Sequence, residues 1–159
     1  MRITPTIVTL ALTAFLGVGT AFAMGSNNPP AADTSSEDYT KGRMAVLAGD
    51  YDRGIELLRN VVRQQPRNAD ALNYIGYAFR KKGDLDNAAK YYEAALKFEP
   101  KHKGALEYQG EMFLKMGRLA DARGNLTKLT GLCPSGCEER AELQRAINDY
   151  LAVNPGKGS

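Results

Sequence analysis

The chain is 159 residues long, and its 21 Lys and Arg residues against 18 Asp and Glu residues give a formal net charge of +3 at pH 7. This near balance argues against a nucleic-acid-binding protein or one that binds an anionic membrane surface, because both need concentrated positive charge. A single histidine and two cysteines leave no material for a catalytic triad beyond a cysteine-based one. We therefore expect a protein that is not an enzyme and that has no cofactor and no metal site.

Residues 1–23 have the pattern of a secretory signal peptide. Arg2 supplies the positive start, residues 7–18 are mainly apolar, and Ala21, Phe22 and Ala23 fit a cleavage site after Ala23. The apolar run is shorter than the ~20 residues that a membrane-spanning helix needs, so we expect no stable membrane insertion after cleavage. The pattern predicts export to a bacterial periplasm, with secretion from the cell as the alternative.

Residues 24–36 are rich in Gly, Ser, Asn and Pro, which predicts a flexible linker before a folded domain over residues 37–153. That domain contains a repeat with a constant period. A fixed period of this length predicts a stack of helical hairpins, because one hairpin cannot bury its apolar face alone. The residues that recur every 34 positions are Pro66, Pro100 and Pro134; Gly42, Gly76 and Gly110; and Gly49, Gly83 and Gly117.

The middle copy, which is the most regular, predicts two helices. Leu72, Ile75 and Phe79 lie on one stripe at helical spacing, and Gly76 within that stripe would let a partner helix approach closely. We expect Gly83 to end this first helix and the acidic residues from Asp84 onward to begin the next.

The second helix of this copy carries an apolar stripe that begins at Ala88 and Tyr92, and Pro100 stops it. The sequence Leu72-x-x-Ile75-Gly76-x-x-Phe79, followed by Ala88-x-x-x-Tyr92 and Pro100, closely resembles the tetratricopeptide repeat. The resemblance implies an all-α, right-handed superhelical solenoid of three helix-turn-helix repeats, at about 35–68, 69–102 and 103–134. The first copy departs most from the pattern, since Asp38, Lys41 and Ala45 occupy its large apolar places.

A final amphipathic helix is predicted over residues 136–152, where it would cap the open apolar end of the solenoid. Ser135 and Glu138 fit a capping box at its start, and residues 154–159 should form a disordered tail. We expect Ala141, Leu143, Ala146, Ile147, Tyr150 and Leu151 on its buried stripe, and Glu139, Arg140 and Asp149 on its outer face.

Cys133 and Cys137 are the only cysteines, and they flank the turn before this last helix. In an oxidising compartment a structural disulfide is the simplest interpretation. A thiol-redox pair or a copper-handling site is the alternative, because a thiol near a helix N-terminus has a lowered pKa. His102 follows Pro100 in a loop, and we expect it to be solvated and to have no role.

The resemblance implies that the exposed positions on the first helix of each hairpin line a groove for a peptide or a partner helix. Exposed tyrosine and arginine side chains support this, since these residue types anchor interfaces. The places that would clamp the C-terminal carboxylate of a heat-shock chaperone hold one basic residue, so we do not expect that clamp. The predicted groove residues are Tyr39, Arg43, Asn73, Tyr74, Tyr77, Arg80, Lys81, Glu107, Tyr108 and Glu111.

The predicted groove runs from basic at Arg43 and Arg80 to acidic at Glu107 and Glu111, which would orient a bipolar peptide. The sequence therefore predicts a monomeric adaptor or scaffold that binds a protein or peptide partner. The alternatives are the thiol-redox or copper-handling factor and a structural protein whose repeats associate with one another end to end.

Overall fold

The computed structural model describes residues 34–157, and within them the chain forms seven α-helices and a short 3-10 helix, with no β-strand. This confirms the all-α class predicted from the repeat. The helices are α1 (Thr34–Leu47), α2 (Tyr51–Gln64), α3 (Ala69–Lys81), α4 (Leu85–Phe98), α5 (Lys103–Lys115), α6 (Leu119–Leu132) and α7 (Glu138–Val153), followed by η1 (Pro155–Lys157).

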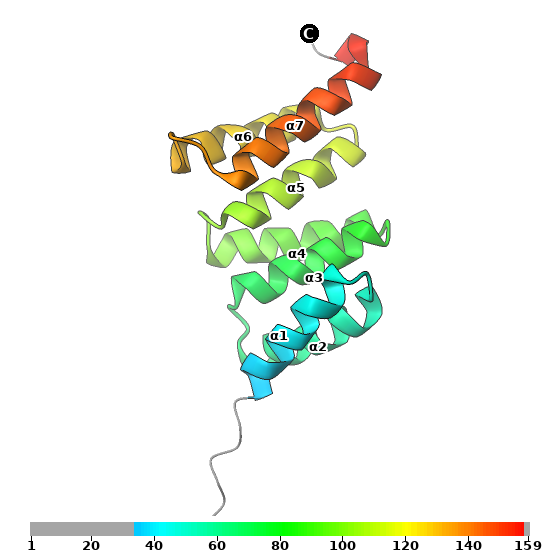
Figure 1. Ribbon diagram of the computed structural model, residues 1–159, viewed down its shortest axis with the longest axis vertical. Helices are drawn as coiled ribbons and strands as arrows, with labels where there is room; N and C mark the ends of the chain where they lie inside the picture. Colours follow the sequence, from blue (N-terminus) through cyan, green and yellow to red (C-terminus); the bar gives the residue numbers. More distant parts are fainter. Residues whose placement is uncertain (1–33, 158–159) are drawn as a thin grey trace, which may run out of the picture. The chain divides into compact units, whose positions relative to one another are not determined.

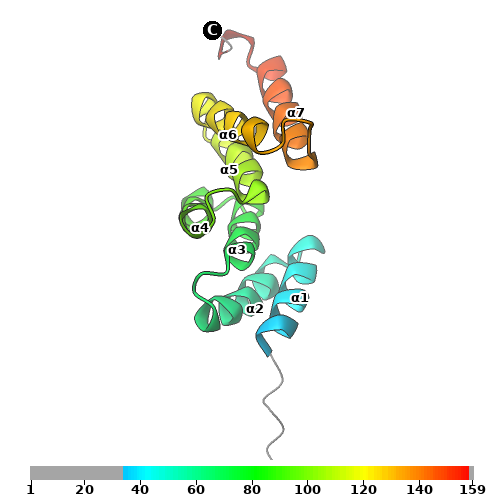
Figure 2. The same cartoon turned by 90° about the vertical axis from the view of Figure 1, so that its left-hand side faces the viewer.

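The first six helices form three hairpins that stack in chain order (Figure 1). Each helix packs most closely on its hairpin partner, and the second helix of each hairpin also contacts the next helix along the chain. The first helices contact one another as well, α1 with α3, α3 with α5, and α5 with α7. In the view of Figure 2, α1, α3, α5 and α7 therefore follow one side of the stack, and α2, α4 and α6 follow the other.

The helix boundaries in the middle hairpin are those that the sequence predicts. Gly83 follows the end of α3 with φ at +85°, a left-handed conformation that glycine adopts without a steric penalty. The next residue, Asp84, is the N-cap of α4, and its side chain accepts a hydrogen bond from the Asn87 amide. At the other end α4 stops at Phe98, two residues before Pro100.

Gly76 and Gly110 are two of the helical glycines at which neighbouring helices approach closely. A Cβ atom at Gly76 would lie 2.8 Å from a ring carbon of Tyr92, which is fully buried in the core between α3 and α4. A Cβ atom at Gly110 would lie 2.6 Å from Cδ1 of Leu143, so this glycine admits α7 rather than α6. The close approach predicted for Gly76 is confirmed, and the one at Gly110 shows how the last helix closes the stack.

Both ends of the folded region differ from the sequence expectation. Helix α1 begins at Thr34, so residues 34–36 are helical and not linker. At the other end, Pro155–Lys157 form a turn of 3-10 helix within the segment expected to be a tail. The predicted signal peptide and residues 24–33 lie outside the described residues.

The predicted capping box at the start of α7 is wrong. The N-cap is Cys137, and no side chain caps the helix there. A disulfide joins Cys137 to Cys133, and Arg140 Nη1 donates to the carbonyl oxygens of Cys133 and Pro134. The turn is therefore held by a covalent bond and a guanidinium group in place of the serine side chain.

The apolar stripe predicted for α7 is confirmed except at Ala141, which is exposed to solvent. Leu143 and Ile147 are buried, and three further residues of the stripe pack against the same core: Ala146, Tyr150 and Leu151. Helix α7 packs on α5 and α6 through this stripe. No helix among residues 34–157 has the length and apolar character needed to cross a membrane.

Candidate functional site: a groove on the first helices

A cavity of about 530 Å³ lies on the side of the stack that carries the first helices. Helix α3 supplies one wall through residues at spacings of three and four, from Asp70 through Tyr74 and Tyr77 to Lys81. Helix α5 supplies the floor and α7 the opposite wall. The remaining lining residues are Asn73 and Arg80 from α3; His102, Gly104, Glu107, Tyr108 and Glu111 at or on α5; and Glu138, Glu139 and Glu142 on α7.

Eight of the ten predicted groove residues line this cavity. The other two, Tyr39 and Arg43, extend its wall onto α1 through Tyr74. Arg43 Nε donates a hydrogen bond of 2.8 Å to the Tyr74 hydroxyl, and the rings of Tyr39 and Tyr74 are 6.4 Å apart in an edge-on arrangement. Tyr77 and Tyr108 continue the aromatic surface with ring centroids 4.8 Å apart.

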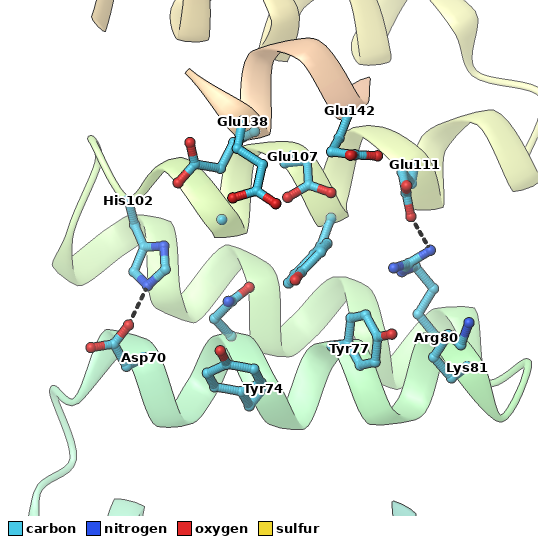
Figure 3. A pocket seen from close by; sticks show the side chains of 14 residues that line it. Asp70, Tyr74, Tyr77, Arg80, Lys81, His102, Glu107, Glu111, Glu138 and Glu142 are labelled. Carbon is cyan, nitrogen blue, oxygen red and sulfur yellow. Dashed lines mark hydrogen bonds and ion pairs between the residues drawn. The ribbon is translucent and has the colours of Figure 1, made fainter. Parts of the chain in front are cut away.

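Arg80 is not the exposed anchor that the sequence suggests. Its side chain is only 5% exposed and forms an ion pair with Glu111, which Figure 3 marks. Its Nε donates to the hydroxyl of the buried Tyr92 at 3.3 Å, and its guanidinium lies over the rings of Tyr77 and Tyr108 at 5.1 and 5.4 Å. Because α5 covers this part of α3, Arg80 joins the two repeats and its charge is neutralised within the protein.

Asn73 and Glu107 are also buried, at 3% and 7% exposure, where the sequence predicts solvent-facing positions. A single-helix projection places them away from the apolar stripe of their own helix, but the neighbouring first helix then packs over them. Their burial is a consequence of stacking, which spacing within one repeat does not reveal.

Glu107 carries the most perturbed carboxyl group of the groove. Burial, followed by repulsion from Glu111, raises its pKa to about 8, while Arg80 opposes the shift and Glu142 and Glu139 add to it. The hydrogen bonds and ion pairs among the described residues do not include one to Glu107. Figure 3 shows Glu107 and Glu142 directed from α5 and α7 toward the same part of the cavity.

His102 has a defined structural role, so the expectation that it is solvated is wrong. Its side chain is 10% exposed, and its Nδ1 accepts a hydrogen bond from the Ala105 amide as the N-cap of α5. Its Nε2 lies 3.1 Å from Asp70 Oδ1 on α3 (Figure 3). A neutral imidazole protonated on Nε2 satisfies both contacts, since Nδ1 must then be the acceptor.

The acidic wall supplied by α7 is the part of the site that the sequence interpretation missed. Glu138 was expected in a capping box and Glu139 on the outer face, yet both line the cavity. The 34-residue period extends into α7 and could have found this wall. It relates Asp70 and Gly104 to Glu138, and Tyr74 and Tyr108 to Glu142.

The disulfide lies apart from this site, because neither Cys133 nor Cys137 lines the cavity. Residues 34–157 also contain no group of three or more His, Cys, Asp or Glu side chains placed to hold a metal ion. The groove thus combines aromatic surface with carboxylates, and its arrangement is suited to holding another molecule by contact and charge.

Comparison with protein families identifies the class of protein. The tetratricopeptide repeat profile matches residues 39–102 and 79–136, which together cover more than half of the chain. The chain therefore belongs to the tetratricopeptide repeat family, as its motifs predict. No curated protein matches the chain.

Solved structures show the same fold at low sequence identity. The translocator chaperone SycD of the Yersinia enterocolitica type III secretion system is 18% identical, with a TM-score of 0.69 over 83% of this chain and 91% of that one. SycD in complex with a peptide of the translocator YopD is 19% identical, with a TM-score of 0.67 over 80% of this chain and 97% of that one. The first tetratricopeptide domain of Spaghetti (RPAP3), bound to the HSP90 peptide SRMEEVD, is 19% identical, with a TM-score of 0.65 over 75% of this chain and 94% of that one.

Proposed function

We propose that this protein is a non-catalytic adaptor, exported to the bacterial periplasm, that binds an extended segment of a partner protein in the groove along α3, α5 and α7. The observation that carries the proposal is the continuous lining of this groove, in which aromatic rings and carboxylates from three successive first helices face one cavity. Tyrosine side chains of this kind provide large contact area at low cost in conformational entropy. We expect the adaptor to act as a monomer.

The fold class supports the same function. Tetratricopeptide repeats are interaction modules, and two of the similar structures, SycD and the Spaghetti domain, hold peptides. The Spaghetti peptide SRMEEVD is acidic at its C-terminal end. In the present groove such a segment would meet the carboxylates of Glu107, Glu138 and Glu142, so the partner segment should be of different charge.

The proposal is tested by cross-linking capture with the full chain from an extract of the native cells, using a matched pair of variants. Tyr74→Ala removes a half-buried groove tyrosine whose hydroxyl accepts a hydrogen bond from Arg43. Tyr91→Ala removes a half-buried tyrosine of α4 whose hydroxyl accepts one from Arg59, on the other side of the stack. The two variants lose comparable packing, so a difference between them reports on the binding surface.

We expect the unmodified chain and Tyr91→Ala to capture the same partner, and Tyr74→Ala to lose it. The captured segment, synthesised as a peptide, should then bind the unmodified chain with an affinity that falls at least about tenfold in Tyr74→Ala. Equal loss in both variants, or retention in both, would remove the groove from the proposed function.

A further inference from the structure

One end of the cavity holds carboxyl groups that no cation of the described residues pairs with inside the cavity. Six carboxylates line the cavity against two permanent cations, Arg80 and Lys81. Arg80 is committed to Glu111, and Lys81 lies over the Tyr77 ring with 5.8 Å between its Nζ and the ring centroid. The carboxyl groups that lack a cation inside the cavity therefore gather between α5 and α7.

The carboxylates of this end differ in how far they are already paired. Glu142 lies 2.7 Å from Arg145, and Glu139 is 3.7 Å from Lys103. Neither cation lines the cavity, so both approach these carboxylates from outside it. Glu107 and Glu138 have no ion-pair partner within residues 34–157. The least exposed carboxylate, Glu107, is thus also unpaired.

A second observation at the same place is independent of the acidic charge. The Asn73 side chain is 97% buried against the cavity, and its Oδ1 is the one buried side-chain oxygen or nitrogen of residues 36–156 that lacks a hydrogen-bond partner. An amide oxygen accepts hydrogen bonds and cannot donate them, so a ligand that satisfies it must bring a donor. An unsatisfied buried acceptor destabilises the fold, and a bound donor would remove that cost.

At the opposite end of the same cavity, the protein already holds one of its own cations against aromatic rings and a carboxylate. The guanidinium of Arg80 lies against the faces of Tyr77 and Tyr108 and pairs with a carboxylate of α5. A second cation on the α7 side would find carboxylates, an amide acceptor and the ring of Tyr74 in a similar setting. The arrangement suits an organic cation that donates several hydrogen bonds, and the described residues offer no three-ligand cluster for a metal ion.

We infer that this end of the groove binds a lysine or arginine side chain of the partner segment, with Glu107 and the Asn73 amide oxygen as its main contacts. The inference rests on the proposed function and adds to it the chemistry of the partner. Adaptor specificity would then depend on a basic residue, flanked by residues that contact Tyr74 and Tyr77.

The test is a selection of displayed random peptides, flanked on both sides so that no free N-terminus is presented, against the full chain. Selections against Glu107→Gln and Glu93→Gln are run in parallel. Glu107→Gln keeps the shape of the side chain and removes its charge, while Glu93 is an exposed glutamate of α4 outside the cavity. We expect Lys or Arg to be enriched at one position by the unmodified chain and by Glu93→Gln, and this enrichment to disappear with Glu107→Gln.

The outcomes separate this inference from the proposed function. Peptides that are selected without a fixed basic position would overturn the inference and leave the adaptor function standing, provided that Tyr74→Ala abolishes their binding. Failure to select any peptide that depends on Tyr74 would count against both. Binding of free spermidine as tightly as the selected peptide would show a small-cation site and would also overturn the inference.

A double-mutant cycle then locates the contact. For a selected peptide, replacement of its basic residue by norleucine should weaken binding to the unmodified chain at least about tenfold and leave binding to Glu107→Gln within about twofold. Equal losses with both proteins would place the basic residue elsewhere in the groove.

Discussion

The two ends of the groove contain similar residues in opposite electrostatic states. At one end Arg80 and Glu111 pair with each other, and Arg80 also donates to the buried Tyr92 hydroxyl. At the other end Glu107 is nearly as buried as Arg80 but has no ion-pair partner among the described residues, and Asn73 Oδ1 has no donor. A buried charge that is already paired has no capacity for a ligand and destabilises the stack when its partner is removed, whereas a buried carboxyl group without a cation can still pair with one. The state of pairing therefore separates the structural end from the binding end.

The largest effect should come from breaking the paired end. We expect Arg80→Ala to lower the free energy of unfolding by about 3–5 kcal/mol, because it leaves the Glu111 carboxylate and the Tyr92 hydroxyl without their partner. Urea unfolding monitored by circular dichroism measures the change. This loss of stability also makes Arg80→Ala a poor probe of binding.

Arg59→Ala is the matched control for this variant. Arg59 donates to a tyrosine hydroxyl at 3.3 Å and lies 5.7 Å from the centre of the Phe79 ring, but it is exposed and has no carboxylate partner within the described chain. Its loss should cost less than about 1 kcal/mol. Equal costs for the two arginines would mean that Arg80 contributes packing alone.

An intermediate effect is expected where α7 joins the groove. Gly110→Ala would place a methyl group 2.6 Å from Cδ1 of the fully buried Leu143, so the α7 contact must shift. We expect a loss of about 1–3 kcal/mol in the free energy of unfolding. Because α7 supplies Glu138 and Glu142, binding of a basic peptide should weaken in the same variant.

Gly124→Ala provides the comparison for Gly110→Ala. Gly124 is an exposed residue inside α6, and an added Cβ atom there meets nothing within 4 Å. This change should stabilise the protein by about 0.5–1 kcal/mol through helix propensity alone and leave peptide binding unchanged. Destabilisation by Gly124→Ala would show that propensity does not govern these positions.

How much the sequence predicts depends on whether a contact lies within one repeat or between two repeats. The 34-residue period predicts the hairpins, the turn at Gly83 and the close approach of a helix at Gly76, because these depend on neighbours within one repeat. The burial of Arg80 and Glu107 depends on the next first helix, which a single-helix projection omits. A prediction from the period was therefore accurate within hairpins and weaker between them.

The role of α7 escaped prediction for a related reason. Its sequence lacks the glycine and apolar signature of the repeats, so its acidic residues were interpreted as helix-start and surface residues. In the structure α7 occupies the place of a fourth first helix and contacts α5, which directs Glu138 and Glu142 into the groove. The sequence spacing contains this information only if the period is continued beyond the last proline.

A smaller effect than those at Arg80 and Gly110 is a dependence of stability on pH at the unpaired end. The groups that face Glu107 are Glu111 on its own helix, Arg80 from α3, and Glu139 and Glu142 from α7. Burial and these carboxylates raise the pKa of Glu107 from the ordinary 4.5 to about 8 in the folded chain. Between these values the folded state binds more protons than the unfolded state, so the stabilising contribution is complete below about pH 4.5 and is lost as the pH rises through 8.

This loss should amount to about 1 kcal/mol between pH 6 and pH 9, since partial solvent access reduces the effect of the charge. Glu107→Gln cannot ionise, so its free energy of unfolding should fall less over this interval, while Glu93→Gln should follow the unmodified chain. Urea unfolding at a series of pH values measures the difference.

The same proton must leave Glu107 when a cationic side chain binds beside it, so peptide affinity should rise with pH and become constant above about pH 8. An affinity that is independent of pH in the unmodified chain would place the bound cation away from Glu107, and would do so without relying on any change in the sequence.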